Sequence, residues 1–371
     1  MSNTFILEQK ELAATLGFMQ PICSKKTTMQ ATSLILFHVT QKELILKATD
    51  LEISLQYTCS IKDSEIANQQ FLVSGKKIFD IVRELDNDIT FTLKKNQLDI
   101  SSGKVHLSLN IKDAQEFPPL PERIENLMHM DREFLLEMFT KVSFLIPQNN
   151  ATPSLNGLFL EISSQEFKMT TTDGHCLAQV KSDKYVLSET KKWLTPRRAV
   201  FEIKKILENC QDEMIFLGVC SNQLVFSGES FNFFTKLLAD QFPAYESILK
   251  KDGFNPARVS RADFIKTLRR STCLLSGQFL ATSFNFSPHQ LKVCLKNNEV
   301  GSLEETLAME DYNGESLEMR FYSPYLLNGL QALSGDNVTC YLKNSTRPII
   351  FESVDKNSQM VYLVMPVSAT K

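Results

Sequence analysis

Apolar residues recur with helical spacing in three segments, EQKELAATLGFM, DREFLLEMFTKVSFL and SRADFIKTLRRSTCLL, which begin near Glu8, Asp131 and Ser260. An interval of three to four residues between apolar positions indicates an amphipathic helix. The starts lie 123 and 129 residues apart. A second set of helices with the same rhythm is predicted from Lys76 (KKIFDIVREL), Arg197 (RRAVFEIKKIL) and Ser323 (SPYLLNGLQAL).

Between the helices, apolar and polar residues alternate in short runs rich in β-branched and aromatic side chains. Examples are LILKATDLEISLQYTC, QLDISSGKVHLSLN and QLVFSGESFNFFTKLL. Such alternation, broken by tight turns, predicts antiparallel strands. Each unit is therefore expected to run helix, strands, helix, strands, with two helices packed on one face of an antiparallel sheet, which is an α+β architecture.

Four landmarks return in the same order at a nearly constant offset, which indicates an internal repeat. They are Thr49-Asp50-Leu51 and Thr172-Asp173-Gly174 (offset 123), Ser102-Gly103 and Ser227-Gly228 (125), Phe117-Pro118 and Phe242-Pro243 (125), and the helices from Lys76 and Arg197 (121). Proline punctuates the chain after each Phe-Pro pair, where boundaries are expected. We predict three repeated domains, at residues 1–126, 127–253 and 254–371.

Composition limits the chemistry of the chain. A run of about 18 apolar residues, which a membrane helix needs, is missing, and the N-terminus lacks a basic segment followed by an apolar core. The eight cysteines are scattered without a C-x-x-C pair, which argues against a zinc site and for reduced thiols. We therefore expect a cytoplasmic protein with no membrane contact.

The charge balance is close to neutral, with 40 basic and 43 acidic side chains. A domain that grips nucleic acid over its whole surface is usually strongly basic. Any contact with DNA must therefore come from charge gathered on one face.

Motifs for catalysis and nucleotide binding are missing from the sequence. It contains no G-x-x-x-x-G-K-[ST], G-x-G-x-x-G, H-E-x-x-H or G-x-S-x-G, and its five histidines are far apart. We predict a protein without catalytic residues, cofactor or metal. Two alternatives stay open: a hydrolase using Asp173 and His175, and a monomeric scaffold or regulator that binds DNA by one face.

Three motifs carry a family resemblance: LNGLFLE at 155–161, TDGHCLA at 172–178 and YLVMPV at 362–367. In this order and at this chain length, the sequence resembles the bacterial DNA polymerase III β subunit, the processivity sliding clamp. The resemblance implies a head-to-tail homodimer whose six units close into a ring around double-stranded DNA, with helices lining the hole. It also implies a non-catalytic function in DNA replication. The implied partners are the replicative polymerase, the clamp loader and other DNA-processing proteins that carry a short motif.

The resemblance also implies three groups of site residues. A peptide-binding pocket would be formed by Leu155, Thr172, Gly174, His175, Leu177, Pro243, Ile248, Leu363, Val364, Met365 and Val367. A dimer interface would be formed by Leu107 and Leu109 of one subunit against Leu274 and Leu275 of the other. DNA-contacting residues are expected at Lys76 and Arg197.

The basic residues of the predicted helices are the wider set of DNA-contacting candidates. They are Lys76, Lys77, Arg83, Arg197, Arg198, Lys205, Lys266 and Arg270, with Arg132, Lys141, Lys204 and Arg269, and with Lys25 and Lys26 in a nearby loop. In the third unit, Phe264, Leu268 and Leu275 form an apolar helical face and the basic residues lie on another side, as expected for a helix between sheet and DNA.

Four positions depart from the pattern of the family. Thr152, Ser154, Cys176 and Ser247 stand where relatives often carry basic or aromatic residues. We expect these changes to make the rim of the pocket less basic and less aromatic, and the partners to carry a shifted motif.

Overall fold

The computed structural model describes residues 3–25, 27–121, 123–276 and 279–367. These residues form two compact units, which are described separately. The first unit comprises the residues up to Arg132 together with Phe201–Leu237, and the second comprises Glu133–Val200 with the residues from Leu238 onward. The central repeat thus contributes to both units.

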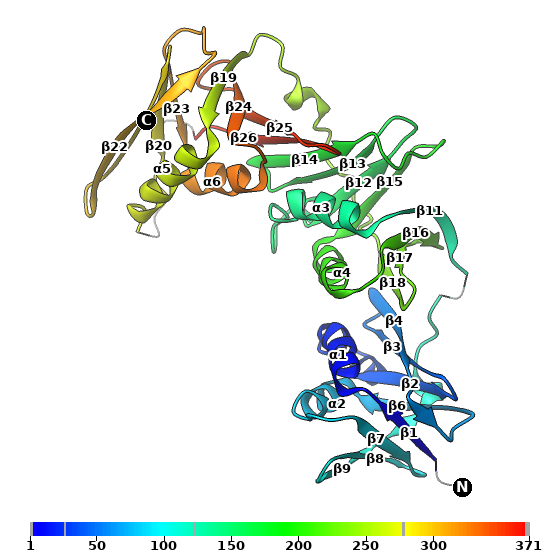
Figure 1. Ribbon diagram of the computed structural model, residues 1–371. Coiled ribbons are helices and arrows are strands. Elements are labelled where there is room, and N and C mark those ends of the chain that lie inside the picture. The colour runs from blue at the N-terminus through cyan, green and yellow to red at the C-terminus, as the bar shows by residue number, and fades with distance from the viewer. Residues whose placement is uncertain (1–2, 26, 122, 277–278, 368–371) are drawn as a thin grey trace. The chain divides into compact units, whose positions relative to one another are not determined.

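The helices begin within one residue of the predicted positions. The described residues form α1 (Gln9–Cys23), α2 (Gly75–Val82), α3 (Arg132–Ser143), α4 (Arg197–Asn209), α5 (Arg261–Cys273) and α6 (Ser323–Ala332). In Figure 1, α1 and α2 lie side by side on one face of their sheet, and α5 and α6 do the same in the other unit. None of the described helices combines the length and apolar character needed to span a bilayer.

The first unit contains a five-stranded and a nine-stranded antiparallel sheet. Their orders are β5-β1-β7-β8-β9 and β10-β6-β2-β3-β4-β18-β17-β16-β11. The strands are β1 (Thr4–Leu7), β2 (Leu34–Thr40), β3 (Glu43–Thr49), β4 (Ile53–Ser60), β5 (Asp63–Ser64), β6 (Asn68–Ser74), β7 (Ile89–Leu93), β8 (Gln97–Ser102), β9 (Val105–Asn110), β10 (Lys112–Asp113), β11 (Glu125–Asp131), β16 (Met214–Cys220), β17 (Gln223–Ser227) and β18 (Phe231–Lys236).

The second unit contains one twelve-stranded sheet in the order β15-β12-β13-β14-β26-β25-β24-β19-β22-β21-β20-β23. The strands are β12 (Gly157–Ile162), β13 (Phe167–Thr172), β14 (Cys176–Ser182), β15 (Lys191–Pro196), β19 (Asn255–Ser260), β20 (Thr282–Ser287), β21 (Gln290–Asn297), β22 (Gly301–Glu310), β23 (Leu317–Phe321), β24 (Asn337–Leu342), β25 (Ile349–Val354) and β26 (Gln359–Val364). The sheet passes from the central to the C-terminal repeat at the pair β14–β26, just as β4–β18 joins the first repeat to the central one.

Each repeat opens with a strand that the sequence pattern did not predict. β1, β11 and β19 precede α1, α3 and α5, so the order is strand, helix, strands, helix, strands. The predicted apolar face of α5 is confirmed, because Phe264 and Leu268 are completely buried. The two helices of a repeat cover one sheet face with their apolar stripes, which leaves their polar stripes exposed.

Candidate peptide-binding groove and basic helix faces

A tight turn at Thr172–Cys176 forms one wall of the candidate pocket. The Asp173 carboxylate accepts hydrogen bonds from the backbone N–H groups of His175 (2.8 Å) and Cys176 (2.7 Å). The Thr172 hydroxyl accepts from the Gly174 N–H (3.1 Å) and donates to the Cys176 carbonyl. Gly174 has a φ of 94°, a left-handed conformation that a glycine adopts without a steric penalty. The turn is thus rigid.

This geometry weighs against the hydrolase alternative. The Asp173 oxygen that would orient a catalytic histidine is occupied by two backbone amides of its own turn. The His175 ring stacks on Tyr325, with the ring centroids 5.9 Å apart. A triad needs the carboxylate to hold the imidazole through a hydrogen bond, and the carboxylate here holds the backbone instead.

The last strand of the chain lies against this turn. β26 pairs with β14 so that Leu363 faces Leu177, and the Met365 N–H donates to the His175 carbonyl (2.9 Å). The Met365 side chain is 38% exposed. The turn and the strand end thus lie side by side, with a flexible apolar side chain at their edge.

The segment between the central and C-terminal repeats forms the third wall. Phe242 and Tyr245 are buried in one apolar cluster with Leu177, Leu194, Ile350, Val361 and Leu363. Pro243 and Ile248, on the same segment, are exposed. Burying the two aromatic residues therefore fixes a chain segment on which Pro243 and Ile248 face solvent.

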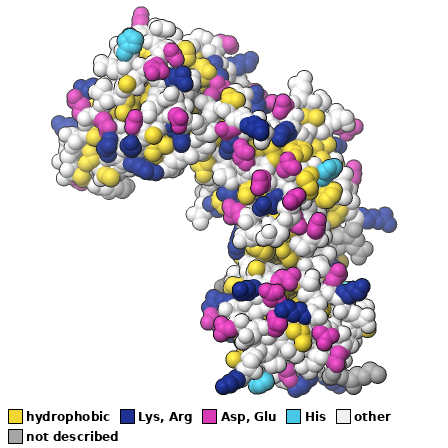
Figure 2. Space-filling view, viewed as in Figure 1, with side chains coloured by type: hydrophobic (Ala, Val, Ile, Leu, Met, Phe, Trp, Pro, Cys, Tyr) yellow, Lys and Arg dark blue, Asp and Glu magenta, His cyan; other side chains and the backbone are white. Residues whose placement is uncertain are grey.

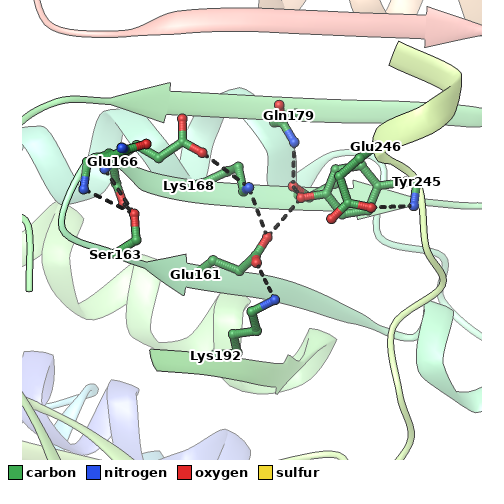
Figure 3. A network of polar contacts seen from close by, with 10 residues as sticks. Glu161, Ser163, Glu166, Lys168, Gln179, Lys192, Tyr245 and Glu246 are labelled. Atoms are coloured by element: carbon green, nitrogen blue, oxygen red, sulfur yellow. Dashed lines mark hydrogen bonds and ion pairs between the residues drawn. The ribbon is translucent and has the colours of Figure 1, made fainter. Parts of the chain in front are cut away.

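A buried polar network anchors Tyr245 from below (Figure 3). The Tyr245 hydroxyl donates to the Glu161 carboxylate (2.9 Å), which is also paired with Lys168 (3.2 Å) and Lys192 (3.0 Å). The Thr170 hydroxyl donates to the Tyr245 oxygen (3.2 Å). Neighbouring strands of one sheet supply these partners, so the network ties the segment to a rigid surface.

The network shifts the protonation equilibria of its members. Burial raises the pKa of Glu161, but hydrogen bonds from Lys192 and Tyr245 and the charge of Lys168 outweigh it, so the pKa lies below its usual value. Burial lowers the pKa of Lys168, but the neighbouring Tyr245, Glu161 and Glu166 outweigh burial and the pKa is raised. Burial raises the pKa of Tyr245 to about 12. Glu161 and Lys168 are therefore both charged at neutral pH.

The structure brings most of the predicted pocket residues together in the second unit, with different exposure. Gly174, His175, Pro243, Ile248 and Met365 are exposed, Val367 is half-buried, and Leu155, Thr172, Leu177, Leu363 and Val364 are buried. Val364 differs from the others: it has no exposed surface, and alternation along β26 turns it away from the face that carries Leu363. In this structure Val364 is a core residue.

The four departures from the family pattern affect different parts of the protein. Thr152 and Ser247 are exposed, as a change in the rim requires. Cys176 and Ser154 are buried, which corrects the expectation that all four alter the rim. Burial and the neighbouring Asp173 raise the pKa of the Cys176 thiol, so it is a neutral core residue.

An aromatic row beside His175 was missed by the sequence analysis. Tyr325 stacks on His175, Tyr322 meets Tyr325 edge-on (5.2 Å between centroids), and Phe279 stacks on Tyr322 (4.7 Å). Phe279 is 60% exposed. The spacing Tyr-x-x-Tyr at the start of the predicted helix from Ser323 was the available signal.

A cavity of about 530 Å³ borders the same strand end. It is lined by Glu318, Arg320, Ser345, Thr346 and Met365–Val367. The Val367 N–H donates to the Arg320 carbonyl (2.8 Å), which holds the chain along this cavity. The exposed Met365 side chain at the strand end is therefore part of the lining of a hollow of ligand size.

The basic candidates on the helices are mostly exposed but differ in their partners. Lys76 and Lys77 are exposed on α2, and Arg83 pairs with its neighbour Glu84. On α4, Arg197 donates to the Ile146 carbonyl (3.0 Å) and Lys205 to the Gly17 carbonyl (3.1 Å). Arg198, on the same helix, is half-buried. On α5, Lys266 pairs with Asp263 and Arg270 pairs with Glu305. In the loop after α1, Lys25 pairs with Glu52, and Lys26 lies outside the described residues.

Lys141 is a wrong prediction. It was expected among the lining charges, but it is only 8% exposed and its ammonium contacts Glu137 (2.6 Å), Ser358 (2.6 Å) and Asp355. An ammonium needs such partners when it is removed from water, and these partners point it into the protein. Figure 2 shows that Lys and Arg side chains are interspersed with Asp and Glu over the visible face.

The residues expected at the dimer interface also differ in exposure. β9 is an edge strand of the five-stranded sheet, with Leu107 40% exposed and Leu109 half-buried. Leu274 is half-buried at the end of α5, whereas Leu275 is buried within its own unit. Of the two leucines of the third repeat, Leu274 is the one accessible to a partner.

Repeats of two helices on antiparallel sheet, joined edge to edge, together with a groove at the junction of the last two, define the class of DNA clamps. Three models of the DNA polymerase III beta subunit match the chain: the N-terminal domain at residues 3–121, the central domain at 129–244 and the C-terminal domain at 246–368. The chain belongs to the DNA polymerase III beta subunit family.

Similar proteins extend over the whole chain. The beta sliding clamp of Proteus mirabilis is 27% identical over 98% of this chain and 99% of its own length. The beta sliding clamp of Pseudomonas putida is 25% identical over the same shares. The solved sliding clamp of Bartonella birtlesii, bound to griselimycin, has a TM-score of 0.90 and 25% identity and covers both chains completely. The Bacillus subtilis clamp, at 20% identity and a TM-score of 0.91, shares the fold.

Proposed function

We propose that this protein is a sliding clamp of DNA replication: two copies close head to tail into a ring that encircles duplex DNA and tethers DNA-processing proteins. The observation that carries the proposal is the match of all three family domains in order along the chain. We propose domain boundaries at 126/127, in the gap between the first two matched ranges, and at 253/254, a few residues after the third matched range begins at 246. A clamp has no chemistry of its own, so the proposed function is non-catalytic.

The ring requires two complementary sheet edges. β9 offers a free edge with the exposed side chains of Val105 and Leu107. An unpaired edge with aliphatic side chains invites another strand, and a head-to-tail contact that closes by rotation makes a ring without free edges. We propose that the partner surface is the end of α5 at Leu274 and the strand beside it.

Topological linkage explains the modest charge. A closed ring stays on DNA without tight contacts, so it can slide, and each fixed phosphate contact would add drag and salt dependence. Lys76, Lys77 and Arg197 on the helices, with acids such as Glu84 close by, suit weak attraction. We propose that the basic residues predicted on the helices contact DNA, with the exception of the buried Lys141.

The groove of the second unit suits a short peptide from a polymerase or a clamp loader. Its rigid turn, its fixed linker and the Met365 edge present apolar surface with few charges, which suits aliphatic and aromatic anchors. The bound partner would then act at a high local concentration along the DNA. The aromatic row from His175 to Phe279 extends this surface.

Small-angle X-ray scattering with mass calibration tests the assembly. A solid globule of two chains would have a radius of gyration of roughly 27 Å. We expect the mass of a dimer, a clearly larger radius and a hollow distance distribution. Leu107→Asp should convert this species to a folded monomer, while Leu44→Asp, at a buried position of the same repeat, should unfold its domain. A compact dimer at the solid-globule radius would contradict the ring.

A further inference from the structure

The groove of the second unit has a structural counterpart in the first unit, at the junction of the first two repeats. The Asp50 carboxylate accepts from the backbone N–H groups of Glu52 (3.0 Å) and Ile53 (2.8 Å), as Asp173 does from His175 and Cys176. The Thr49 hydroxyl accepts from the Leu51 N–H (3.1 Å), as Thr172 does from Gly174.

The strand that closes the groove is repeated as well. The Lys236 N–H, at the end of β18, donates to the Glu52 carbonyl at 2.9 Å, the same bond and distance as between Met365 and His175. β18 pairs with β4 so that Phe234 faces Ser54, where Leu363 faces Leu177 in the other unit. The hydrogen bonds and the strand register show which positions of the two units are structurally equivalent. Leu51 corresponds to Gly174, Ser54 to Leu177 and Lys236 to Met365.

At this junction the counterpart residues line a cavity of about 720 Å³, within the range of ligand pockets. Its walls include the turn (Thr49, Leu51), the strand residue Ser54, the linker Pro118–Pro121, and Lys236. The positions equivalent to Thr49, Leu51, Ser54, Pro118 and Lys236 are all among the candidate peptide-binding residues of the second unit. The walls of the two grooves are thus the same elements, with different side chains at Leu51, Ser54 and Lys236.

The cavity exists because the apolar packing is interrupted. In the second unit one cluster runs from Leu194 through Leu177 to Leu363. Around the first junction, Leu36 and Phe117 belong to one apolar cluster of described residues, and Cys220 and Phe234 belong to another. Ser54 replaces the central leucine, so apolar contact does not bridge the gap.

The side chains that replace the apolar ones indicate what would bind. Leu51 is 39% exposed and has a φ of 73°, an uncommon and costly conformation for a leucine, which holds an aliphatic side chain at the cavity. Arg123 and Lys236 are exposed in the lining, and neither forms an ion pair with another described residue. Proline rings at 118–121 present a stiff apolar surface without N–H donors.

We propose that this cavity is a second peptide-docking groove, which takes an extended segment with an acidic side chain next to an aliphatic one. The carboxylate meets Lys236 and Arg123, and the aliphatic side chain lies against Leu51 and the prolines. The proposal goes beyond the proposed clamp function and does not depend on ring closure. It would allow one subunit to hold two segments of different chemistry, an apolar one in the second unit and an acidic one in the first.

A displayed library of random dodecapeptides tests the proposal on the full chain. The library is depleted on the Lys236→Glu/Arg123→Glu double variant, which removes every peptide that binds elsewhere, and is then selected on the unmodified protein. We expect recovered peptides to carry Asp or Glu beside Leu, Ile or Val. Their binding should weaken about fivefold to tenfold with Lys236→Met, the residue type of the other groove, because a carboxylate loses its charge partner.

Two controls make the result specific. Lys42→Met, at the opposite end of β3 from the turn, removes the same single charge from the same unit as Lys236→Met and should leave binding unchanged. Hydrogen exchange should slow at residues 49–54 and 118–121 when a recovered peptide binds. The proposal is overturned if no peptide survives depletion, if the survivors lack acidic residues, or if they protect other segments. Equal thermal midpoints of all variants confirm that the exposed substitutions leave the fold intact.

Discussion

The two junctions of this chain share one backbone design and differ in how it is filled. Both have an Asp-centred turn, a Phe-Pro linker and a strand end bound to the turn by one hydrogen bond. In the second unit Tyr245 and Leu177 fill the space beneath the linker. In the first unit Ser54 and the half-buried Leu120 stand at the equivalent positions, and a cavity is left.

The difference shows that the hydrogen-bonded frame and the apolar filling are separable properties. Backbone and Asp hydrogen bonds shape the turn in both places, so the turn survives the loss of the leucine and the tyrosine. The filling decides whether the linker is fixed, because it supplies the buried apolar area that holds a segment in one position. A well-fixed linker offers a preformed surface to a ligand, which lowers the entropic cost of binding.

The largest effect on stability is expected from removing the buried side chain of Tyr245 at the junction in the second unit. Tyr245→Ala removes a side chain that is 3% exposed, and we expect a loss of about 3–5 kcal/mol in unfolding free energy. The matched Leu120→Ala should cost about 1 kcal/mol or less, because Leu120 is half-buried. Trp193, the single tryptophan, lies buried in the second unit, so its fluorescence during urea unfolding reports on that unit. Circular dichroism follows the unfolding of both units. Equal losses would remove the contrast between the junctions.

Features that depend on neighbouring residues in the sequence were predicted well, and contacts between residues far apart in the sequence were not. The helix starts followed from apolar periodicity, which is a local property, and the two equivalent turns were indicated by the repeated Thr-Asp pair. The burial of Lys141 depends on Asp355, which lies 214 residues further along the chain. No local pattern reports such a partner, so Lys141 was predicted to be an exposed lining charge.

The anchoring network was missed for the same reason. Glu161, Lys168 and Lys192 are ordinary strand residues in the sequence, and they form one network with Tyr245 only because β12, β13 and β15 are neighbours in the sheet. The pocket residues could be named from the family resemblance, but their exposure could not. Val364 and Cys176 became core residues only when strand register assigned each side chain to a face.

A smaller effect is expected from the charge of the network. The pKa of Glu161 is lowered in the folded state, so its contribution is complete above the ordinary value of 4.5 and is lost as the pH falls through the lowered value. The pKa of Lys168 is raised, so its contribution is complete below 10.5 and is lost at higher pH. The contribution of the Glu161 and Lys168 charges should therefore be constant between these limits.

Glu161→Gln isolates the contribution of the Glu161 charge to stability. The variant should lose about 2 kcal/mol at about pH 7, less than for a wholly buried pair, because Lys192 is half-exposed and screened by water. As the pH falls below 4.5 and through the lowered pKa of Glu161, the difference from the unmodified protein should shrink, because protonation removes the charge that the variant lacks. Urea unfolding followed by Trp193 at several pH values measures it. Glu189→Gln, on an exposed carboxylate of the same unit, is the control and should show no such convergence. A difference that stays constant with pH would assign the loss to packing.

The smallest effects are expected at the two turns, and the two substitutions should differ in size. Gly174→Ala puts a Cβ on a residue with a φ of 94°, and we expect a loss of about 1 kcal/mol from backbone strain. The added Cβ would lie 3.8 Å from Leu155, an ordinary contact, so steric overlap does not contribute. Leu51→Gly relieves the same kind of strain at a φ of 73° while adding freedom to the unfolded chain, so stability should change by less than about 0.5 kcal/mol. Thermal unfolding of both variants measures the two changes in stability. If Leu51→Gly costs as much as Gly174→Ala, the leucine is held by packing in the first unit, and the cavity would lose the aliphatic wall that the second groove requires.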